Sequence, residues 1–258
     1  MQIKGQTIWV TGASSGMGRA LALALAQAGN HVIASGRNET ALKRLEEQAS
    51  GTISRLPVDL TDDASISKAR QQLHVLTDQL DMVIVNAGDC EYLDVKAFDH
   101  RLVERVFAIN FQGAVRTIDT ALELLNKRRE ARIVFISSLS TLLPFARAEA
   151  YGASKAALEY FAKSMAIDLA IANSGLKVCI VRPGFVKTAL TDKNTFHMPF
   201  LIAAEDAANR IIHGLEKGRS NIAFPRRLNW ALKILALFPL FWQKHLAPVA
   251  ASDRSQAW

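Results

Sequence analysis

The sequence predicts an α/β protein of one domain, residues 1–258, built on a doubly wound parallel sheet of seven strands with helices on both faces. Short runs rich in β-branched residues alternate with longer amphipathic or alanine-rich stretches, which is the order that βαβ units produce. Several short runs, such as residues 82–85 and 133–136, are apolar without interruption, as strands covered on both faces are. A chain of 258 residues that is 50% hydrophobic can bury one large core.

The alternation assigns each element a place along the chain. Strands are expected at residues 7–10, 31–35, 52–58, 82–86, 132–137, 177–181 and 221–224. Helices are expected at residues 18–28, 40–48, 64–77, 98–126, 151–172 and 206–216. Right-handed crossovers between parallel strands place ligands at the carboxyl ends of the strands, so the polar residues that follow each strand are candidates for function.

Composition argues against several other classes of protein. The net charge is +7, but the basic residues are scattered apart from short clusters at residues 127–129 and 226–227, so nucleic-acid binding is not expected. The two cysteines, Cys90 and Cys179, lack the spacing of a metal site; no metal is expected, and a reducing, cytoplasmic compartment is favoured. The first residues lack the apolar run of a signal peptide, so secretion is not expected.

A glycine-rich loop follows the first expected strand and runs directly into a helix. Its characteristic residues are Gly12, Ser14, Ser15, Gly16, Met17 and Gly18. Glycines permit a tight turn and let backbone amides approach a pyrophosphate, and the N-terminus of the following helix favours negative charge. Such a loop by itself is also compatible with a structural turn, but its place between the first strand and the first helix favours a dinucleotide site.

The end of the second expected strand favours NADP (NADPH) over NAD. An NAD-selective site needs a carboxylate there to accept hydrogen bonds from the ribose hydroxyls, and this sequence has Gly36 instead, followed by Arg37. A guanidinium can hold a 2′-phosphate with several donors. The alternative is that Arg37 is only a solvated loop residue. Ser35 and Asn38 offer further hydrogen bonds to the same ligand.

Tyr151 and Lys155 form the sharpest catalytic pattern. Positions i and i+4 of a helix share a face, so the two side chains are expected to point the same way. A nearby ammonium favours the phenolate, which predicts a pKa for Tyr151 below the ordinary value of about 10. A pair at this spacing also occurs by chance on protein surfaces, so the assignment depends on the motifs around it.

Taken together, the motifs resemble the classical short-chain dehydrogenase/reductase superfamily, which has a Rossmann fold. Loop residues 11–18 have its TGxxxGxG spacing, and Ser138 lies thirteen positions before Tyr151, as in that family. The resemblance implies that Ser138 orients the substrate oxygen and that Tyr151 is the general acid and base. It also implies that Lys155 holds the nicotinamide ribose, and that Asn110, in the middle of the long helix, anchors a water for proton relay.

The same resemblance, which extends to about residue 188, implies further cofactor contacts. Asp59 would bind the adenine amino group, with the Leu60 backbone nearby, although an aspartate before a helix is by itself more typical of an N-cap or turn. The segment on the adenosine side is matched by Asn86, Ala87 and Gly88, with Val85 in place of the usual asparagine. The segment beside the nicotinamide is matched by Pro183, Gly184, Val186 and Thr188.

These motifs predict an NADP(H)-dependent oxidoreductase that acts on CH–OH groups and interconverts a carbonyl and an alcohol by hydride transfer. Two segments rich in large apolar side chains flank the expected nicotinamide site, the second within a substrate lid at about residues 185–204. The expected substrate contacts are Ser138, Leu139, Phe145, Phe185 and Phe196. They favour an apolar substrate, unless these side chains pack only against the core of the protein.

A non-enzymatic NADP-binding regulator of the same fold is the alternative function. The full set of Asn110, Ser138, Tyr151 and Lys155 favours the enzyme, since a regulator does not need a proton relay. By resemblance, the long helices at residues 98–126 and 151–172 are expected to form a homodimer or homotetramer.

An apolar helical segment is expected at about residues 227–246. Its uncharged run between Lys233 and Lys244 is interrupted by Pro239 and is too short to span a membrane. Two interpretations remain open for it: burial against the domain or a partner subunit, or peripheral contact with a membrane through aromatic anchors and basic flanks.

Overall fold

The structure, a computed structural model, describes residues 2–49, 51–128, 130–194 and 198–248. Seven strands form one sheet in the order β3-β2-β1-β4-β5-β6-β7, and every neighbouring pair is parallel. They are β1 (Thr7–Thr11), β2 (His31–Gly36), β3 (Ile53–Pro57), β4 (Met82–Val85), β5 (Arg132–Ile136), β6 (Lys177–Pro183) and β7 (Asn221–Phe224). The predicted doubly wound parallel sheet is confirmed.

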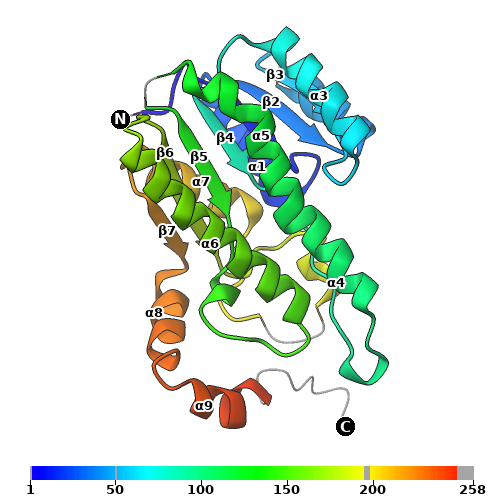
Figure 1. The fold of residues 1–258 in the computed structure, drawn as a ribbon, viewed down its shortest axis with the longest axis vertical. Coiled ribbons are helices and arrows are strands. Elements are labelled where there is room, and N and C mark those ends of the chain that lie inside the picture. Colours follow the sequence, from blue (N-terminus) through cyan, green and yellow to red (C-terminus); the bar gives the residue numbers. More distant parts are fainter. Residues whose placement is uncertain (1, 50, 129, 195–197, 249–258) are drawn as a thin grey trace.

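Helices cover both faces of this sheet (Figure 1). They are α1 (Gly16–Gln27), α2 (Glu39–Gln48), α3 (Asp63–Leu76), α4 (His100–Phe107), α5 (Gly113–Asn126), α6 (Glu149–Ile171), α7 (Ala204–Glu216), α8 (Arg226–Leu235) and α9 (Pro239–Phe241). Helices α1, α2 and α7 pack against one face, and α3, α5 and α6 pack against the other.

Alternate side chains of the central strand β1 enter two separate cores. Ile8 and Val10 join the core beneath α1 and α7, whereas Trp9 joins the core beneath α3, α5 and α6. The indole of Trp9 is almost wholly buried and donates a 2.6 Å hydrogen bond to Ser35 Oγ of β2. A buried polar group needs such a partner. The Ser35 hydroxyl, expected near the cofactor, is therefore engaged inside the sheet.

The long helix expected at residues 98–126 is interrupted. It consists of α4 and α5, joined by one π-helical turn, Ala108–Gln112. Asn110 lies in this turn and is fully buried. Such turns inside helices are frequent at functional sites, and this one aims the Asn110 amide at the backbone that follows β4.

The strand order changes direction between β1 and β4, since β2 and β3 lie on one side of β1 and the later strands on the other. Ligands of doubly wound sheets bind at such a switch point, outside the carboxyl ends of the strands. Helices α8 and α9 extend beyond this edge of the sheet, and α4 lies across from them (Figure 1). Among the described residues, no helix has the length and apolar character needed to cross a membrane.

Candidate active site

A cavity of about 980 Å³ opens at the carboxyl ends of β1, β4, β5 and β6. Most residues predicted for the cofactor line it: Gly12, Ser14, Ser15, Gly16, Met17, Gly18, Arg37, Leu60, Asn86, Ala87, Gly88, Tyr151, Lys155, Pro183, Gly184, Val186 and Thr188. Its lining also includes the predicted substrate contacts Ser138, Leu139, Phe145 and Phe185. The remaining predicted contact, Phe196, lies outside the described residues. Motifs far apart in the sequence thus converge on one cavity, which has room for an extended ligand.

The glycine-rich loop approaches the end of β4 closely. Gly12 has a φ of +68°, and a Cβ at this position would lie 2.8 Å from Ala87 Cα, so only glycine fits without moving the backbone. Helix α1 begins at Gly16, and within the described part of the chain the Ser15 side chain makes no capping hydrogen bond. The first residues of α1 line the cavity, where their amide groups can bind an anion such as a pyrophosphate.

Thr11 and Asn86 hold the ends of β1 and β4 together. Thr11 Oγ1 accepts hydrogen bonds from the amides of Asn86, at 3.1 Å, and Ala87, at 3.2 Å. Asn86 Nδ2 donates to the carbonyl oxygens of Thr11, at 2.9 Å, and Gly12, at 3.3 Å. Val85, which stands where the family that the motifs resemble usually has an asparagine, is buried in the core beneath α3, α5 and α6. Apolar burial therefore takes the place of a polar contact there.

The end of β2 presents a cation to the cavity. A Cβ added at Gly36 would lie 2.9 Å from Ser14 Oγ, so a larger residue would require Ser14 to move. The exposed Arg37 lines the cavity. Asn38 instead caps α2, because its Oδ1 accepts a 2.9 Å hydrogen bond from the Ala41 amide. Of the three polar residues predicted at this strand end, Ser35 and Asn38 are engaged within the protein, and Arg37 lines the cavity, where its guanidinium can bind a ligand.

Asp59 lies outside the lining of the cavity. Its Oδ1 accepts hydrogen bonds from the Thr61 amide, at 2.9 Å, and from Thr61 Oγ1, at 2.7 Å. This is the turn role that an aspartate takes before a helix. Its neighbours Leu60 and Thr61 line the cavity in its place.

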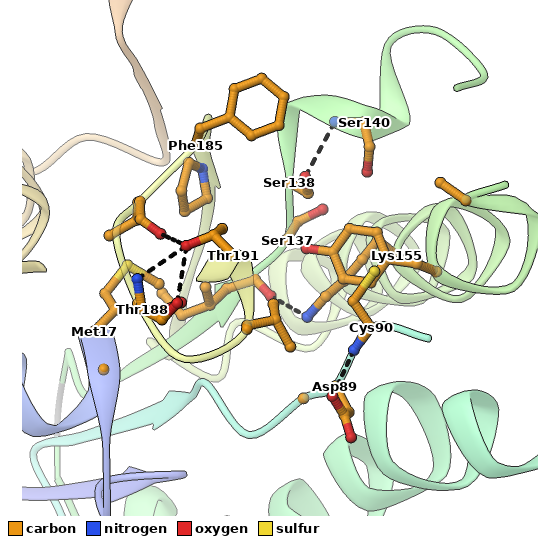
Figure 2. Close-up of a pocket in the computed structure, with 18 of the residues that line it drawn as sticks. Met17, Asp89, Cys90, Ser137, Ser138, Ser140, Lys155, Phe185, Thr188 and Thr191 are labelled. Carbon is orange, nitrogen blue, oxygen red and sulfur yellow. Dashed lines mark hydrogen bonds between the residues drawn. The ribbon is translucent and has the colours of Figure 1, made fainter. Parts of the chain in front are cut away.

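Lys155 is buried at the carboxyl end of β5. Its Nζ donates a 2.9 Å hydrogen bond to the Ile136 carbonyl oxygen and lies 5.9 Å from the centre of the Tyr151 ring. Burial lowers the pKa of Lys155 to about 8, because the low-dielectric surroundings disfavour the ammonium. Figure 2 shows Lys155 and Ser138 on one side of the cavity, with Met17 and Thr188 on the other.

The sequence-based expectation for the Tyr151 pKa is wrong in this structure. Burial of the phenol raises its pKa to about 12, and a hydrogen bond with Ser138 only partly opposes this shift. Loss of hydration is the largest cause of this shift, and the Nζ of Lys155 is hydrogen-bonded to the Ile136 carbonyl oxygen. Tyr151 is therefore a neutral phenol at ordinary pH. Ser138 Oγ also accepts a 3.1 Å hydrogen bond from the Ser140 amide, which fixes the hydroxyl beside the ring.

Asn110 lies behind the cavity lining. Its Oδ1 accepts a 2.8 Å hydrogen bond from the Asp89 amide, and its Nδ2 donates to the Asp89 carbonyl oxygen and to Ser154 Oγ, both at 2.9 Å. A Cβ added at Gly88 would lie 2.9 Å from Asn110 Oδ1 and 3.3 Å from Lys155 Nζ. The amide therefore sits close to the lysine while it holds the backbone after β4.

One buried cluster was not anticipated from the sequence. Glu159, four residues after Lys155 on α6, accepts hydrogen bonds from Arg182 Nε, at 2.7 Å, and from a terminal guanidinium nitrogen, at 2.6 Å. Its Oε1 also accepts from the hydroxyls of Ser137 and Thr141, each at 2.8 Å. Ser137 and Thr141 lie on either side of Ser138 in the chain. The cluster therefore holds the segment that contains Ser138 in place. A conspicuous sign in the sequence was the acidic residue at the i+4 position after the lysine.

The C-terminal helices also line the cavity. The sequence had left open what this segment packs against. The lining residues there are Leu228, Ala231, Leu232, Leu235, Trp242 and Ala247. Trp242 is buried, and its Nε1 donates a 2.7 Å hydrogen bond to the Pro144 carbonyl oxygen. Its ring meets that of Phe145 edge to face, with centroids 5.4 Å apart. One face of this segment is thus buried against the domain.

The described parts of the segment expected as a lid contribute residues to the cavity lining, among them Phe185, Thr188 and Pro199. Val186, after β6, forms a parallel bridge with Ile202, before α7. Thr191 Oγ1 accepts a 2.9 Å hydrogen bond from the Thr188 amide and donates to the Val186 carbonyl oxygen at 2.8 Å. These contacts hold Thr188 beside the glycine-rich loop, where a Cβ at Gly16 would lie 3.0 Å from its methyl group.

The sequence of this chain is similar to those of known dehydrogenases and oxidoreductases. The family model for short chain dehydrogenases matches residues 6–198. An uncharacterized oxidoreductase of Myxococcus xanthus is 36% identical over 91% of this chain and 93% of its own. A fatty acyl-CoA reductase of Acinetobacter baylyi is 33% identical over 86% of this chain and 76% of its own.

A solved short-chain dehydrogenase/reductase of Burkholderia phymatum, in complex with NAD, shares the fold. Its TM-score is 0.81 over 90% of this chain and 93% of that one, with 19% sequence identity. The family model covers most of the chain, and the motifs on which it depends meet at the cavity. The chain therefore belongs to the short-chain dehydrogenase family of oxidoreductases.

Proposed function

We propose that this protein is an NADP(H)-dependent oxidoreductase that interconverts a carbonyl compound and an alcohol. The observation that carries the proposal is that Ser138, Tyr151 and Lys155 line the same cavity as the glycine-rich loop. Hydroxyls that can bind a substrate oxygen thus adjoin amides that can bind a pyrophosphate. The fold shared with a dehydrogenase solved in complex with NAD supports a pyridine nucleotide as the cofactor.

A bound nicotinamide cofactor would supply or accept the hydride. The residues of the chain handle the substrate oxygen and its proton. Ser138 donates a hydrogen bond to that oxygen, and Tyr151, a neutral phenol with a pKa of about 12, donates the proton that the oxygen gains on reduction. In the opposite direction Tyr151 receives the proton of the alcohol. The Lys155 ammonium stabilises the phenolate left behind, and Asn110 holds the backbone beside it.

The pH dependence of cofactor use follows from Lys155. Its ammonium is the form that attracts the cofactor and the phenolate, and its pKa is lowered to about 8 by burial. The ammonium is present below that pKa and is lost as the pH rises through it. We therefore expect kcat/KM for NADPH, which reports the free enzyme, to fall above pH 8. Steady-state kinetics between pH 6 and 10, with Lys155→Arg as the control, checks this; a flat profile in the wild type would contradict it.

Preference for NADP is proposed from Arg37 and Gly36. A guanidinium that binds a 2′-phosphate makes charge-assisted hydrogen bonds. Arg37→Ala is therefore expected to raise KM for NADPH by about tenfold or more, since such bonds contribute on the order of 1.5–3 kcal/mol, and to leave KM for NADH nearly unchanged. The matched control is Arg44→Ala, an exposed arginine on α2. Equal effects of Arg37→Ala on both cofactors would remove the basis for the NADP preference.

An apolar carbonyl or alcohol is proposed as the substrate. The cavity wall near Ser138 carries Leu139, Phe145, Phe185, Leu228 and Leu232. Similarity to a relative named as a fatty acyl-CoA reductase supports a lipid-like substrate. The test is NADPH oxidation over a panel of carbonyl compounds of graded polarity, with NADH as the control. Turnover of long-chain aldehydes or aryl ketones supports the proposal, whereas a preference for sugars, or NADPH binding without any turnover, contradicts it.

A homodimer or homotetramer formed through α6 is part of the same proposal. Three large apolar side chains on this helix are exposed: Tyr160, Ile167 and Ile171. Residues seven and eleven positions apart share one helix face, so Tyr160, Ile167 and Ile171 form a stripe that a second subunit can cover. Cys90 and Cys179 are both buried thiols, which agrees with the reducing, cytoplasmic compartment that we propose.

A further inference from the structure

Large apolar side chains gather on the outer side of the C-terminal helices. Six lie exposed within twelve residues: Trp230, Ile234, Leu237, Phe238, Leu240 and Phe241. We call this set the C-terminal patch. Leu237, the most exposed of them, has 74% of its surface accessible. Single exposed apolar residues are ordinary, but a contiguous group of this kind marks an interaction surface.

Nearly all of the net charge of the protein lies in the same part of the chain. Residues 217–248 contain six lysines and arginines and no aspartate or glutamate, whereas the formal net charge of the whole chain is +7. Four of these cations flank or interrupt the C-terminal patch: Arg226, Arg227, Lys233 and Lys244. All four are exposed. The surface is therefore both apolar and strongly basic.

Helix α8 separates this surface from the cavity. Its inner face carries Leu228 and Leu232, which line the cavity. Arg226, Trp230 and Lys233 follow one another at intervals of four and three residues, so they share the opposite face. The Lys233 ammonium lies 5.5 Å from the centre of the Trp230 ring. The contacts of Trp242 described above fix the segment to the domain, so the outer face is presented on a held support.

We propose that the C-terminal patch docks on the surface of an anionic lipid bilayer. Aromatic and aliphatic side chains enter the headgroup region of a membrane, and adjacent lysines and arginines are attracted to anionic lipids. The domain itself does not cover the patch, because the side chains of this segment that pack against the domain are those of the inner face of α8 and Trp242. A second copy of this chain does not suit the patch, because a two-fold interface would bring the cations of both copies together, and residues 217–248 hold no carboxylate side chain to pair with them.

Docking of this kind places the cavity next to the bilayer. Leu228, Leu232 and Leu235 of the helix that bears the patch are also cavity walls. An apolar substrate dissolved in the membrane can then reach the cavity along α8 without crossing water. This consequence rests on the proposed function, whereas the docking itself does not.

Vesicle binding tests the docking directly, with the full-length protein and without cofactor or substrate. Cosedimentation is measured with vesicles of phosphatidylcholine alone and of phosphatidylcholine mixed with phosphatidylglycerol. We expect binding to the mixed vesicles that weakens as salt rises from about 0.1 M to about 0.5 M. The triple variant Arg226→Gln/Arg227→Gln/Lys233→Gln is expected to bind these vesicles about 100-fold more weakly, at about fivefold per cation.

The apolar part is tested with Phe238→Ser/Leu240→Ser/Phe241→Ser, which is expected to lose binding on the order of 100-fold or more. Matched controls change the same kinds of residue elsewhere: Lys43→Gln/Arg44→Gln/Lys68→Gln, on α2 and α3, and Val75→Ser/Val95→Ser/Phe98→Ser. Both controls are expected to bind like the wild type. Thermal unfolding of every variant verifies that it is folded.

The fluorescence of Trp230 gives a second measure of membrane contact that does not depend on sedimentation of the vesicles. Of the described tryptophans, Trp9 and Trp242 are buried and Trp230 is 59% exposed. The fourth tryptophan of the sequence, Trp258, lies outside the described residues and is replaced by phenylalanine for this experiment. In the Trp258→Phe protein, vesicles that contain brominated lipid are expected to quench Trp230 fluorescence, and the further change Trp230→Phe is expected to abolish the quenching.

Three results would overturn the proposal. The first is a wild type that stays in the supernatant with both kinds of vesicle. The second is a loss of binding by the control variants as large as that of the patch variants. The third is a patch variant that converts an oligomer into a monomer by light scattering while the wild type does not bind lipid, since the patch would then be a subunit interface. None of these results would bear on NADPH turnover in solution, so failure of the docking and failure of the proposed function are distinguishable.

Discussion

Tyr151→Phe is expected to lower kcat by about 10³-fold while NADPH still binds, because the phenol supplies the proton that the substrate oxygen needs. The ring keeps its packing in the variant, and only the hydroxyl beside Ser138 is lost. Single-turnover NADPH oxidation gives the rate, and quenching of protein fluorescence on titration gives the dissociation constant of NADPH.

The matched control is Tyr160→Phe, an exposed tyrosine nine residues further along α6. It removes the same hydroxyl from the same helix but lies away from the cavity. We expect its turnover to equal that of the wild type. If Tyr151→Phe kept activity within a factor of two of the wild type, Tyr151 would not be the proton donor and the proposed chemistry would fail.

Glu159→Ala is expected to lower the free energy of unfolding by about 3 kcal/mol, because it leaves the Arg182 guanidinium buried without its carboxylate. The side chains of Glu159 and Arg182 are 6% and 14% exposed, so water cannot replace the lost partner readily. Urea unfolding measures the change. For comparison, Glu47→Ala breaks an exposed i,i+4 pair with Lys43 and is expected to cost at most about 0.5 kcal/mol.

The same variant is expected to reduce kcat, since Glu159 positions the segment around Ser138 through Ser137 and Thr141. Glu159→Gln separates the two effects, because its amide oxygen can still accept the two hydroxyl hydrogen bonds while the charge is lost. We expect Gln to restore more of kcat than of stability. A fully stable Glu159→Ala variant would show that the ion pair does not hold this segment.

The stabilisation that the Glu159 carboxylate gives to the folded protein is expected to decrease at acidic pH. Burial alone would raise the pKa of Glu159, but hydrogen bonds from Arg182 and Thr141 and the charge of Arg182 outweigh it, so the pKa is lowered in the folded protein. A lowered folded-state pKa means that the stabilisation is complete above the unfolded value of about 4.3 and is lost as pH falls through the folded value. The difference in unfolding free energy between the wild type and Glu159→Gln should therefore narrow only below about pH 4.

The sequence by itself determined the sheet, its strand boundaries to within two residues, and many of the residues that line the cavity. The predicted Asp59 lies outside that lining, and the contribution of α8 was left open. The features that the sequence determined depend on local signals. Glycine is needed where φ is positive at Gly12, uninterrupted apolar runs mark buried strands, and an i, i+4 spacing places Tyr151 and Lys155 on one helix face.

The tertiary structure alone decided how these residues behave. The Tyr151 pKa is raised rather than lowered, because burial comes from segments far away in the chain. Ser35 and Asn38 are engaged by Trp9 and by α2, and Asp59 by its own turn, although each has a polar group suited to a cofactor. The apolar pattern of residues 227–246 could not say which face is covered, since apolar residues fall on nearly every side of it. Packing against the Pro144 carbonyl and the Phe145 ring buries one face and leaves the C-terminal patch exposed, because burial depends on contacts between distant segments that no local pattern contains.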